Sequence, residues 1–219
     1  MPDTPHDLTA AAVLLDMDGT IVDSTAVVEK IWGEFAERFG IDVDVLLAYS
    51  HGRRSPDTIQ HFLPADDDAA EVTREQEARE LTLMDGIVEV AGAGRLLQSL
   101  AEAPVAVVTS APRELAVARM QAAGLVVPAV LVAAEDVEHG KPSPEGYLKA
   151  AADLGTDITD CVVLEDADAG IEAARASGAH TLVVGGLHSP AAEGLDRLPD
   201  LEGLRASYDV ESRRIRLRF

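Results

Sequence analysis

Aromatic residues and cysteine are scarce in this sequence. Phe, Trp and Tyr make up 4% of the 219 residues, so the hydrophobic core must be built mainly from Ala, Val, Leu and Ile. The single cysteine, Cys161, excludes an intramolecular disulfide bond. Because Cys161 lies within an apolar run, we expect a buried thiol without a chemical role.

Positive charge is also in short supply. The chain has 18 Lys and Arg against 39 Asp and Glu, which gives a formal net charge of −21. This charge counts strongly against nucleic acid or an anionic membrane as the partner. It also repels a phosphorylated ligand at long range. Any phosphate site must therefore be positive locally, through a metal ion, basic side chains and backbone N–H groups.

Long apolar runs are absent. No stretch of about 18 apolar residues exists, so no membrane-spanning helix is predicted. The first residues do not show a basic stretch followed by an apolar one, which is the pattern of a signal peptide. We therefore expect a cytoplasmic protein. We also expect a monomer, because nothing in the sequence requires a dimer.

Strand and helix patterns alternate over most of the chain, which predicts an α/β fold with a parallel sheet covered on both faces. Short apolar runs predict strands at residues 13–15, 105–109, 129–132, 161–164 and 181–184. Apolar spacing and boundary residues predict helices at residues 93–100, 112–123, 144–154 and 169–177. Residues 1–10 are expected to be a frayed lead-in, and residues 204–219 a terminal hairpin that turns near residues 211–212.

Residues 25–86 interrupt this alternation, because they carry helical patterns and no strand signal. Helices are predicted at residues 25–39, 42–48 and 66–84, with a further one that begins at Ser55 as its N-cap. Gly40 provides the stop for the first of them. The sequence thus predicts a core made of residues 1–24 and 87–219, with residues 25–86 inserted as a small helical unit.

Two carboxylates follow the first predicted strand with one residue between them. Asp16 and Asp18 come directly after residues 13–15, and Gly19 then permits a sharp turn. If the chain bends there, both carboxylates converge on the crevice where open α/β sheets bind their ligands. Two acids so close repel each other, which favours a divalent cation or a shared proton. An ordinary acidic turn is the alternative.

Later predicted strands also end in polar clusters. Thr109 and Ser110 suit a phosphate oxygen, although they would equally cap the following helix. Lys141 is one of only three lysines and lies between a glycine and two prolines, which restricts its position; a solvated loop charge is the alternative. Glu165 and Asp166 close another strand, where acids also favour the dipole of the next helix.

Taken in order, these clusters resemble the four motifs of the haloacid dehalogenase-like (HAD) hydrolase superfamily. The string D-M-D-G-T-I-V-D-S looks like the first motif, and L-E-D-A-D-A-G-I-E-A-A looks like the fourth. The resemblance implies a Rossmann-like core in which Asp16 is the nucleophile and Asp18 the general acid/base. It also implies that Thr109 and Ser110 bind the phosphoryl group and that Lys141 pairs with the nucleophile.

The same resemblance implies a Mg²⁺ site. Its ligands would be Asp16, Asp18, Asp166 and Glu165. Asp166 would bind the ion directly, and Glu165 more readily through a water molecule. The family often has Ser after the Glu-Asp pair and Pro two places later, where this chain has Ala167 and Asp168. We expect Asp168 to cap the helix that follows.

The inserted helical unit has the position of the C1 cap of this superfamily. Its turn, H-G-R-R-S-P-D-T-I-Q-H-F, resembles the cap turn of the sugar-phosphate and glycerol-phosphate phosphatases. The resemblance implies substrate contacts from His51, Gly52 and Arg54, with Arg54 preferred to Arg53. Glycine lets the backbone approach a ligand, and arginine can grip phosphate or hydroxyl groups. An exposed turn between helices is the alternative.

The implied function is a Mg²⁺-dependent phosphomonoesterase that hydrolyses a small hexose, hexitol or glycerol phosphate through an aspartyl-phosphate. A phosphosugar mutase of the β-phosphoglucomutase type shares the core and stays open as an alternative. A phosphonatase would need a cap lysine, and Lys30 is the only lysine in that region. A dehalogenase should not carry the D-x-D pair. A catalytically silent binding module on the same fold is the alternative from another class.

Overall fold

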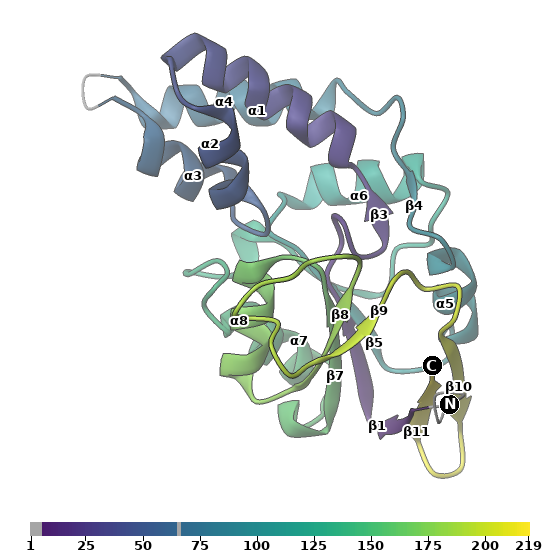
Figure 1. Ribbon diagram of the computed structural model, residues 1–219. Helices are drawn as coiled ribbons and strands as arrows, with labels where there is room; N and C mark the ends of the chain where they lie inside the picture. The colour runs from purple at the N-terminus through teal and green to yellow at the C-terminus, as the bar shows by residue number, and fades with distance from the viewer. Residues whose placement is uncertain (1–5, 65–66) are drawn as a thin grey trace.

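The central feature of the computed structural model, which describes residues 6–64 and 67–219, is a parallel sheet. Its six strands are in the order β6-β5-β2-β7-β8-β9 (Figure 1). Neighbouring strands pair in parallel register throughout. The strands are β2 (Ala12–Leu15), β5 (Val105–Val108), β6 (Val130–Val132), β7 (Cys161–Glu165), β8 (His180–Val184) and β9 (Asp196–Leu198).

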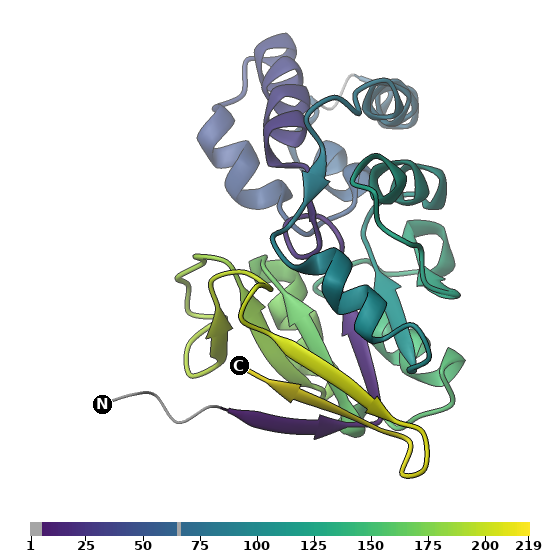
Figure 2. The ribbon, with the colours of Figure 1, turned by 90° about the vertical axis from the view of Figure 1, so that its right-hand side faces the viewer.

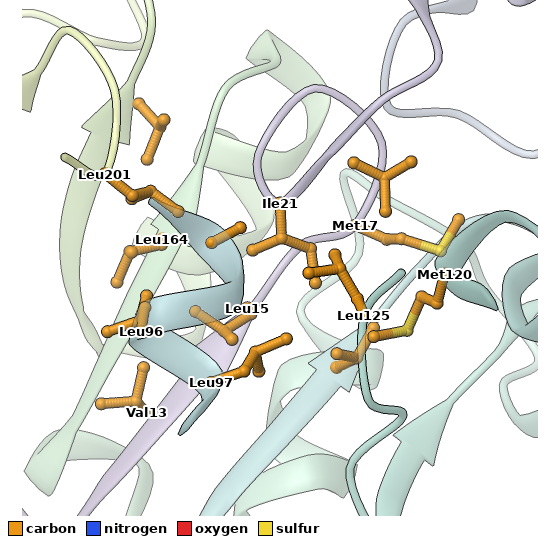
Figure 3. Close-up of a cluster of buried hydrophobic side chains, with 14 of the residues drawn as sticks. Val13, Leu15, Met17, Ile21, Leu96, Leu97, Met120, Leu125, Leu164 and Leu201 are labelled. Carbon is orange, nitrogen blue, oxygen red and sulfur yellow. The ribbon is translucent and has the colours of Figure 1, made fainter. Parts of the chain in front are cut away.

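Helices cover both faces of this sheet, because successive side chains of a strand point to opposite sides. Leu14 packs with α7 (Glu145–Asp153) and α8 (Asp168–Ser177) on one face. Val13 and Leu15 pack with α5 (Ala93–Ser99) and α6 (Arg113–Ala122) on the other face. Figure 3 shows this second cluster, with Leu96 and Leu97 lying against the strand. Two short 3₁₀ turns, η1 (Ala134–Asp136) and η2 (Ile158–Asp160), complete the connections.

A second unit, made of helices α1 to α4, lies beyond the carboxyl ends of the strands (Figure 1). It comprises α1 (Thr25–Phe39), α2 (Val43–Ser50), α3 (Ser55–Phe62) and α4 (Ala69–Leu81). These helices enclose their own hydrophobic cluster, which includes Trp32, Phe35, Leu46, Ile59 and Val72. The chain enters and leaves this unit through a two-stranded antiparallel pair, β3 (Val22–Asp23) and β4 (Val88–Glu89).

A small antiparallel sheet closes the opposite end of the molecule. Strand β1 (Asp7–Ala10) pairs with β11 (Arg214–Arg218), which pairs in turn with β10 (Arg205–Asp209). Figure 2 shows the purple strand β1 beside the yellow hairpin. Ile215 and Leu217 point into the main core, and the alternating arginines point outward. The predicted terminal hairpin is therefore confirmed.

Several sequence predictions need correction. Residues 7–10 are not a frayed lead-in, because β11 provides them with a pairing partner. Strands β3, β4 and β9 were not predicted, since two or three residues are too short to show a periodic pattern. The N-cap of α3 is Arg54 and not Ser55. The predicted start of α4 at Asp66 lies outside the described residues, and α4 begins at Ala69.

The remaining predicted elements are confirmed within a few residues at each end. The helix predicted at residues 25–39 has the same bounds in α1, and Gly40 ends it in a left-handed conformation. Cys161 is buried, as expected. Among residues 6–64 and 67–219, no helix combines the length and apolar character that crossing a membrane requires.

Gly92 provides a test of the packing between α5 and the segment before β10. Its φ is +90°, and a Cβ atom there would lie 2.5 Å from the backbone carbonyl of Leu201. We expect Gly92→Ala to lower the free energy of unfolding by about 3 kcal/mol, since backbone strain and a backbone clash add together. Gly40→Ala is the matched control, because Gly40 also has positive φ but open space around it. Urea denaturation should show a loss of about 1 kcal/mol for the control; equal losses would contradict the packing argument.

Candidate active site

Three neighbouring strands deliver polar side chains to one edge of the sheet. Strand β2 leads directly into Asp16, β5 leads into Thr109, and β7 ends at Glu165 and is followed by Asp166. These strands are adjacent, in the order β5-β2-β7. Because parallel strands place their carboxyl ends at the same edge, residues that are distant in sequence meet there.

Lys141 joins two of these carboxylates. Its side chain is 6% exposed, and the ammonium group donates to Asp16 and to Oε1 of Glu165, the latter at 2.6 Å. A third contact, at 3.2 Å, goes to the carbonyl oxygen of Val108. Burial alone lowers the pKa of Lys141, but the charges of Asp16 and Glu165 outweigh it and raise the pKa. The lysine is therefore a permanent buried cation.

Glu165 is enclosed by donors on all sides. Tyr147 of α7 donates its hydroxyl to Oε1 at 2.7 Å, and the backbone N–H groups of Asp166 and Ala167 donate to Oε2 at 3.0 and 3.3 Å. A Cβ atom at Gly170 would lie 1.7 Å from this carboxylate, so only glycine fits there. The sequence did not single out Tyr147, because an aromatic residue on the apolar face of a predicted helix indicates core packing.

Asp16, Glu165 and Asp166 form an acidic cluster with room for a cation. Their ligand oxygens all lie within 4.8 Å of one another. Burial and the charge of Glu165 raise the pKa of Asp16 well above its ordinary value, while Lys141 acts in the opposite direction. The same two causes raise the pKa of Asp166 to about 7. Crowded carboxylate oxygens are what a hard divalent cation requires, so the residues present fit such an ion.

The side chain of Asp18 lies apart from this cluster. Its Oδ1 accepts a hydrogen bond from the Ser24 hydroxyl at 2.6 Å, and its Oδ2 accepts one from Nη1 of Arg119 at 3.1 Å. Asp18 also lines the main cavity of the site. Gly19, the residue after Asp18, has a φ of +87°, and a Cβ atom there would meet Asp166 at 2.0 Å. The turn that follows Asp18 thus depends on glycine.

Thr109 and Ser110 both line the cavity, but their hydroxyl groups have partners. The Thr109 hydroxyl accepts from the N–H of Ala111 at 3.0 Å, next to the start of α6. The Ser110 hydroxyl donates to the carbonyl oxygen of Gly52 at 2.8 Å. The first contact closes a turn ahead of α6 but does not cap it, because the N-cap is Pro112, which makes no side-chain capping bond. The second links the sheet edge to the turn between α2 and α3.

The main cavity has a volume of about 140 Å³ and lies between the sheet edge and the helical unit. His51, Gly52 and Arg53 line it from the turn between α2 and α3. Val28, Ile31 and Trp32 of α1 supply an apolar wall. Polar groups of the turn and apolar groups of the helix therefore face the acidic cluster across a space of small-molecule size.

The two adjacent arginines of this turn lie differently. Arg53 lines the main cavity, with its guanidinium 4.5 Å from the ring centre of Tyr49. Arg54 does not line that cavity: it pairs with Asp57 at 2.8 Å and donates to the carbonyl of Glu138 at 3.2 Å. Arg54 instead lines a smaller adjoining pocket with Ser110 and Lys141, so the preference for Arg54 stays a prediction.

Asp168 and two further charged residues complete the surroundings. Asp168 is the first residue of α8, Ala167 is the N-cap, and the carboxylate of Asp168 accepts from the hydroxyl of Ser189. The sequence pattern did not single out Arg119 of α6 or Glu80 of α4, although both line the cavity. Charged residues on helices are usually solvated, so their sequence carries no signal of this position.

Comparison with known proteins agrees with the fold. A hydrolase from Pseudomonas syringae of known crystal structure superposes with a TM-score of 0.75 at 24% sequence identity. The match covers 87% of this chain and 95% of the other. This likeness shows that the two proteins share a fold.

Sequence relatives are more informative. Hexitol phosphatase A of Escherichia coli (strain K12) is 43% identical over 176 residues, which cover 78% of this chain and 81% of the relative. Glycerol-1-phosphate phosphohydrolase 2 of Saccharomyces cerevisiae is 34% identical over 185 residues, covering 80% and 74% of the two chains. The model of the haloacid dehalogenase-like hydrolase family matches residues 10–178 of this chain. The chain is therefore an enzyme of the haloacid dehalogenase-like hydrolase family.

Proposed function

We propose that this enzyme is a Mg²⁺-dependent phosphomonoesterase that hydrolyses small sugar or polyol phosphates through an aspartyl-phosphate. The observation that carries the proposal is the Asp16 carboxylate, which is held by Lys141 beside Asp166 at the edge of the main cavity. The names of the two relatives point to a hexitol phosphate and to glycerol phosphate as substrates. Both are phosphate esters of small alcohols.

The acidic cluster is the proposed metal site. Asp16 and Asp166 would hold Mg²⁺, and Glu165 and Asp18 are the further candidates from the sequence. Glu165 already accepts from Lys141 and Tyr147, so a contact through water suits it better than direct ligation. When bound, the ion would offset negative charge on the phosphoryl oxygens, the main requirement of phosphoryl transfer.

The first step belongs to Asp16 and Asp18. An oxygen of the Asp16 carboxylate attacks phosphorus in line, forming an O–P bond as the bond from phosphorus to the substrate alcohol breaks. Lys141 and the hydroxyl group of Thr109 stabilise the phosphoryl oxygens, and Ser110 joins them once its hydroxyl releases the carbonyl of Gly52. Asp18 gives its proton to the leaving alcohol, which would otherwise depart as an alkoxide.

The second step reuses Asp18 as a base. Its carboxylate takes a proton from the water molecule that attacks phosphorus, the acyl phosphate bond to Asp16 breaks, and inorganic phosphate is released. The helical unit covers this site, and His51, Gly52, Arg53 and Arg54 are the proposed contacts to the substrate. We propose that the enzyme is a monomer, that it acts in the cytoplasm, and that its substrate is a small phosphorylated metabolite.

Phosphate release across a panel of esters tests this function. The panel holds glycerol phosphates, hexitol phosphates, hexose 6-phosphates, β-glucose 1-phosphate and nucleotides, each with Mg²⁺. We expect strongest release from a polyol or sugar phosphate. Asp16→Asn should lower kcat by about 1,000-fold or more, because it removes the nucleophile. Isomerisation of glucose 1-phosphate without phosphate release would indicate the mutase instead.

Metal binding should depend on pH. Because the pKa of Asp166 is raised to about 7, the metal-free enzyme binds a proton there below neutral pH, and a cation must displace it. We expect the Kd for Mg²⁺ to be about tenfold weaker at pH 6 than at pH 8, as measured by calorimetry. Asp166→Asn should abolish binding, and Asp168→Asn is the control that retains it. Equal affinity at both pH values would exclude this linkage.

Arg53 and Arg54 can be separated by kinetics. Arg53→Ala should raise KM for the best ester by about tenfold, since a hydrogen bond to a charged group is lost in the cavity. Arg54→Ala should change KM less and should lower thermal stability, because it breaks the contacts with Asp57 and Glu138. A larger rise in KM for Arg54→Ala would support the sequence-based preference.

A further inference from the structure

Arg119 is a buried cation that the reaction described above does not use. It projects from α6, and its side chain is only 4% exposed. Nη1 donates to Asp18 at 3.1 Å and Nη2 donates to Glu80 at 3.1 Å. Its Nε has no hydrogen-bond partner among the described residues. Burying a guanidinium costs free energy unless it is paired, so the two carboxylate partners determine where the Arg119 side chain lies.

At one end of this bridge, Arg119 controls the orientation of Asp18. The carboxylate of Asp18 has one contact on each oxygen, from Ser24 on Oδ1 and from Arg119 on Oδ2. Two donors on opposite oxygens fix both the side-chain rotamer and the plane of the carboxyl group. Ser24 is the N-cap of α1, only six positions after Asp18, so Arg119 is the contact that ties this plane to a distant part of the core.

At the other end, Glu80 fixes Arg119. Glu80 lies on α4 in the helical unit, and its side chain is 8% exposed. Its Oε1 accepts from the Ser55 hydroxyl of α3 at 3.2 Å, while its Oε2 accepts from Arg119. Burial raises the pKa of Glu80, and the charge of Arg119 opposes this shift. Asp18, Arg119, Glu80 and Ser55 thus form one continuous polar chain from the sheet edge to the helical unit.

We propose that Arg119 is a positioning residue that aims Asp18 at the leaving oxygen of the substrate, with Glu80 as its anchor in the helical unit. The inference rests on the proposed phosphatase function, in which Asp18 protonates the alcohol. Alignment of a general acid matters because proton transfer contributes about 10²- to 10⁴-fold to rate. A displacement of about 1 Å can cost about 100-fold. The inference assigns a catalytic purpose to a cation whose hydrogen-bond partners are Asp18 and Glu80.

Two esters with different leaving groups test the proposal. The alcohol of glycerol phosphate or a hexitol phosphate needs a proton as it leaves, whereas p-nitrophenolate leaves without one. The value of kcat/KM reports the steps up to departure of the alcohol. We expect Arg119→Met to lower kcat/KM about 100-fold for the alkyl ester but less than about fivefold for p-nitrophenyl phosphate. A purely structural role would lower both values by the same factor.

Matched variants complete the experiment. Arg119→Lys keeps the charge and should recover part of the alkyl-ester activity. The ratio of kcat/KM for the alkyl ester to kcat/KM for p-nitrophenyl phosphate should fall about tenfold in Glu80→Gln, because this variant removes the anchoring charge. Arg113→Met is the control on the same helix, since Arg113 pairs with Asp136 and does not line the cavity. This control should leave the ratio unchanged.

The outcomes separate this inference from the proposed function. A wild-type enzyme without phosphatase activity, or full activity in Asp16→Asn, would contradict the function itself. An active wild-type enzyme whose Arg119→Met variant loses equal activity on both esters, or loses none, would overturn the positioning role alone. If Arg119→Met does not fold, the ratios for Arg119→Lys and Glu80→Gln decide, and an unchanged ratio in both overturns the proposal.

Discussion

The contact of Lys141 with Asp16 and Glu165 is the interaction on which the rest of the site depends. Three carboxylates have ligand oxygens within 4.8 Å of one another at this sheet edge. At that separation, two like charges repel by roughly 3–4 kcal/mol at an effective dielectric constant of about 20. Lys141 offsets part of this repulsion from a loop outside the sheet. The edge can therefore hold concentrated negative charge, and the proposed cation would offset more of it.

The site residues that could be predicted from the sequence are those that the strands of the sheet position. Asp16, Thr109 and Glu165 each follow or end a short apolar strand, and parallel strands bring such ends together without any detail of packing. Helical residues could not be predicted in this way. Arg119 and Glu80 look like ordinary surface charges on α6 and α4 until the helices are packed. Arg54 was preferred to Arg53 by resemblance, since nothing local in the sequence tells which of two adjacent arginines faces a cavity.

The helical unit is joined to the core partly by polar contacts. Ser110 donates to the carbonyl of Gly52, Arg119 reaches Glu80, and Arg54 reaches the carbonyl of Glu138. All three cross from the sheet unit to the helices, which also keep an apolar cluster of their own. Val27 and Ile31 of α1 also belong to the main core cluster, so apolar packing adds to these polar contacts. The residues that line the cavity are therefore held in place by both kinds of contact.

The pairing of β1 with β11 has a consequence for how the chain folds. Asp7 lies opposite Arg218, 211 positions later, so this sheet has nearly the largest sequence separation that the chain allows. Contacts of high contact order bear the largest loop-closure entropy and form slowly. During synthesis, β1 has no partner until β11 has been translated. The βα units and the helical unit can assemble earlier from local contacts, and the three-stranded sheet then closes the core beneath them.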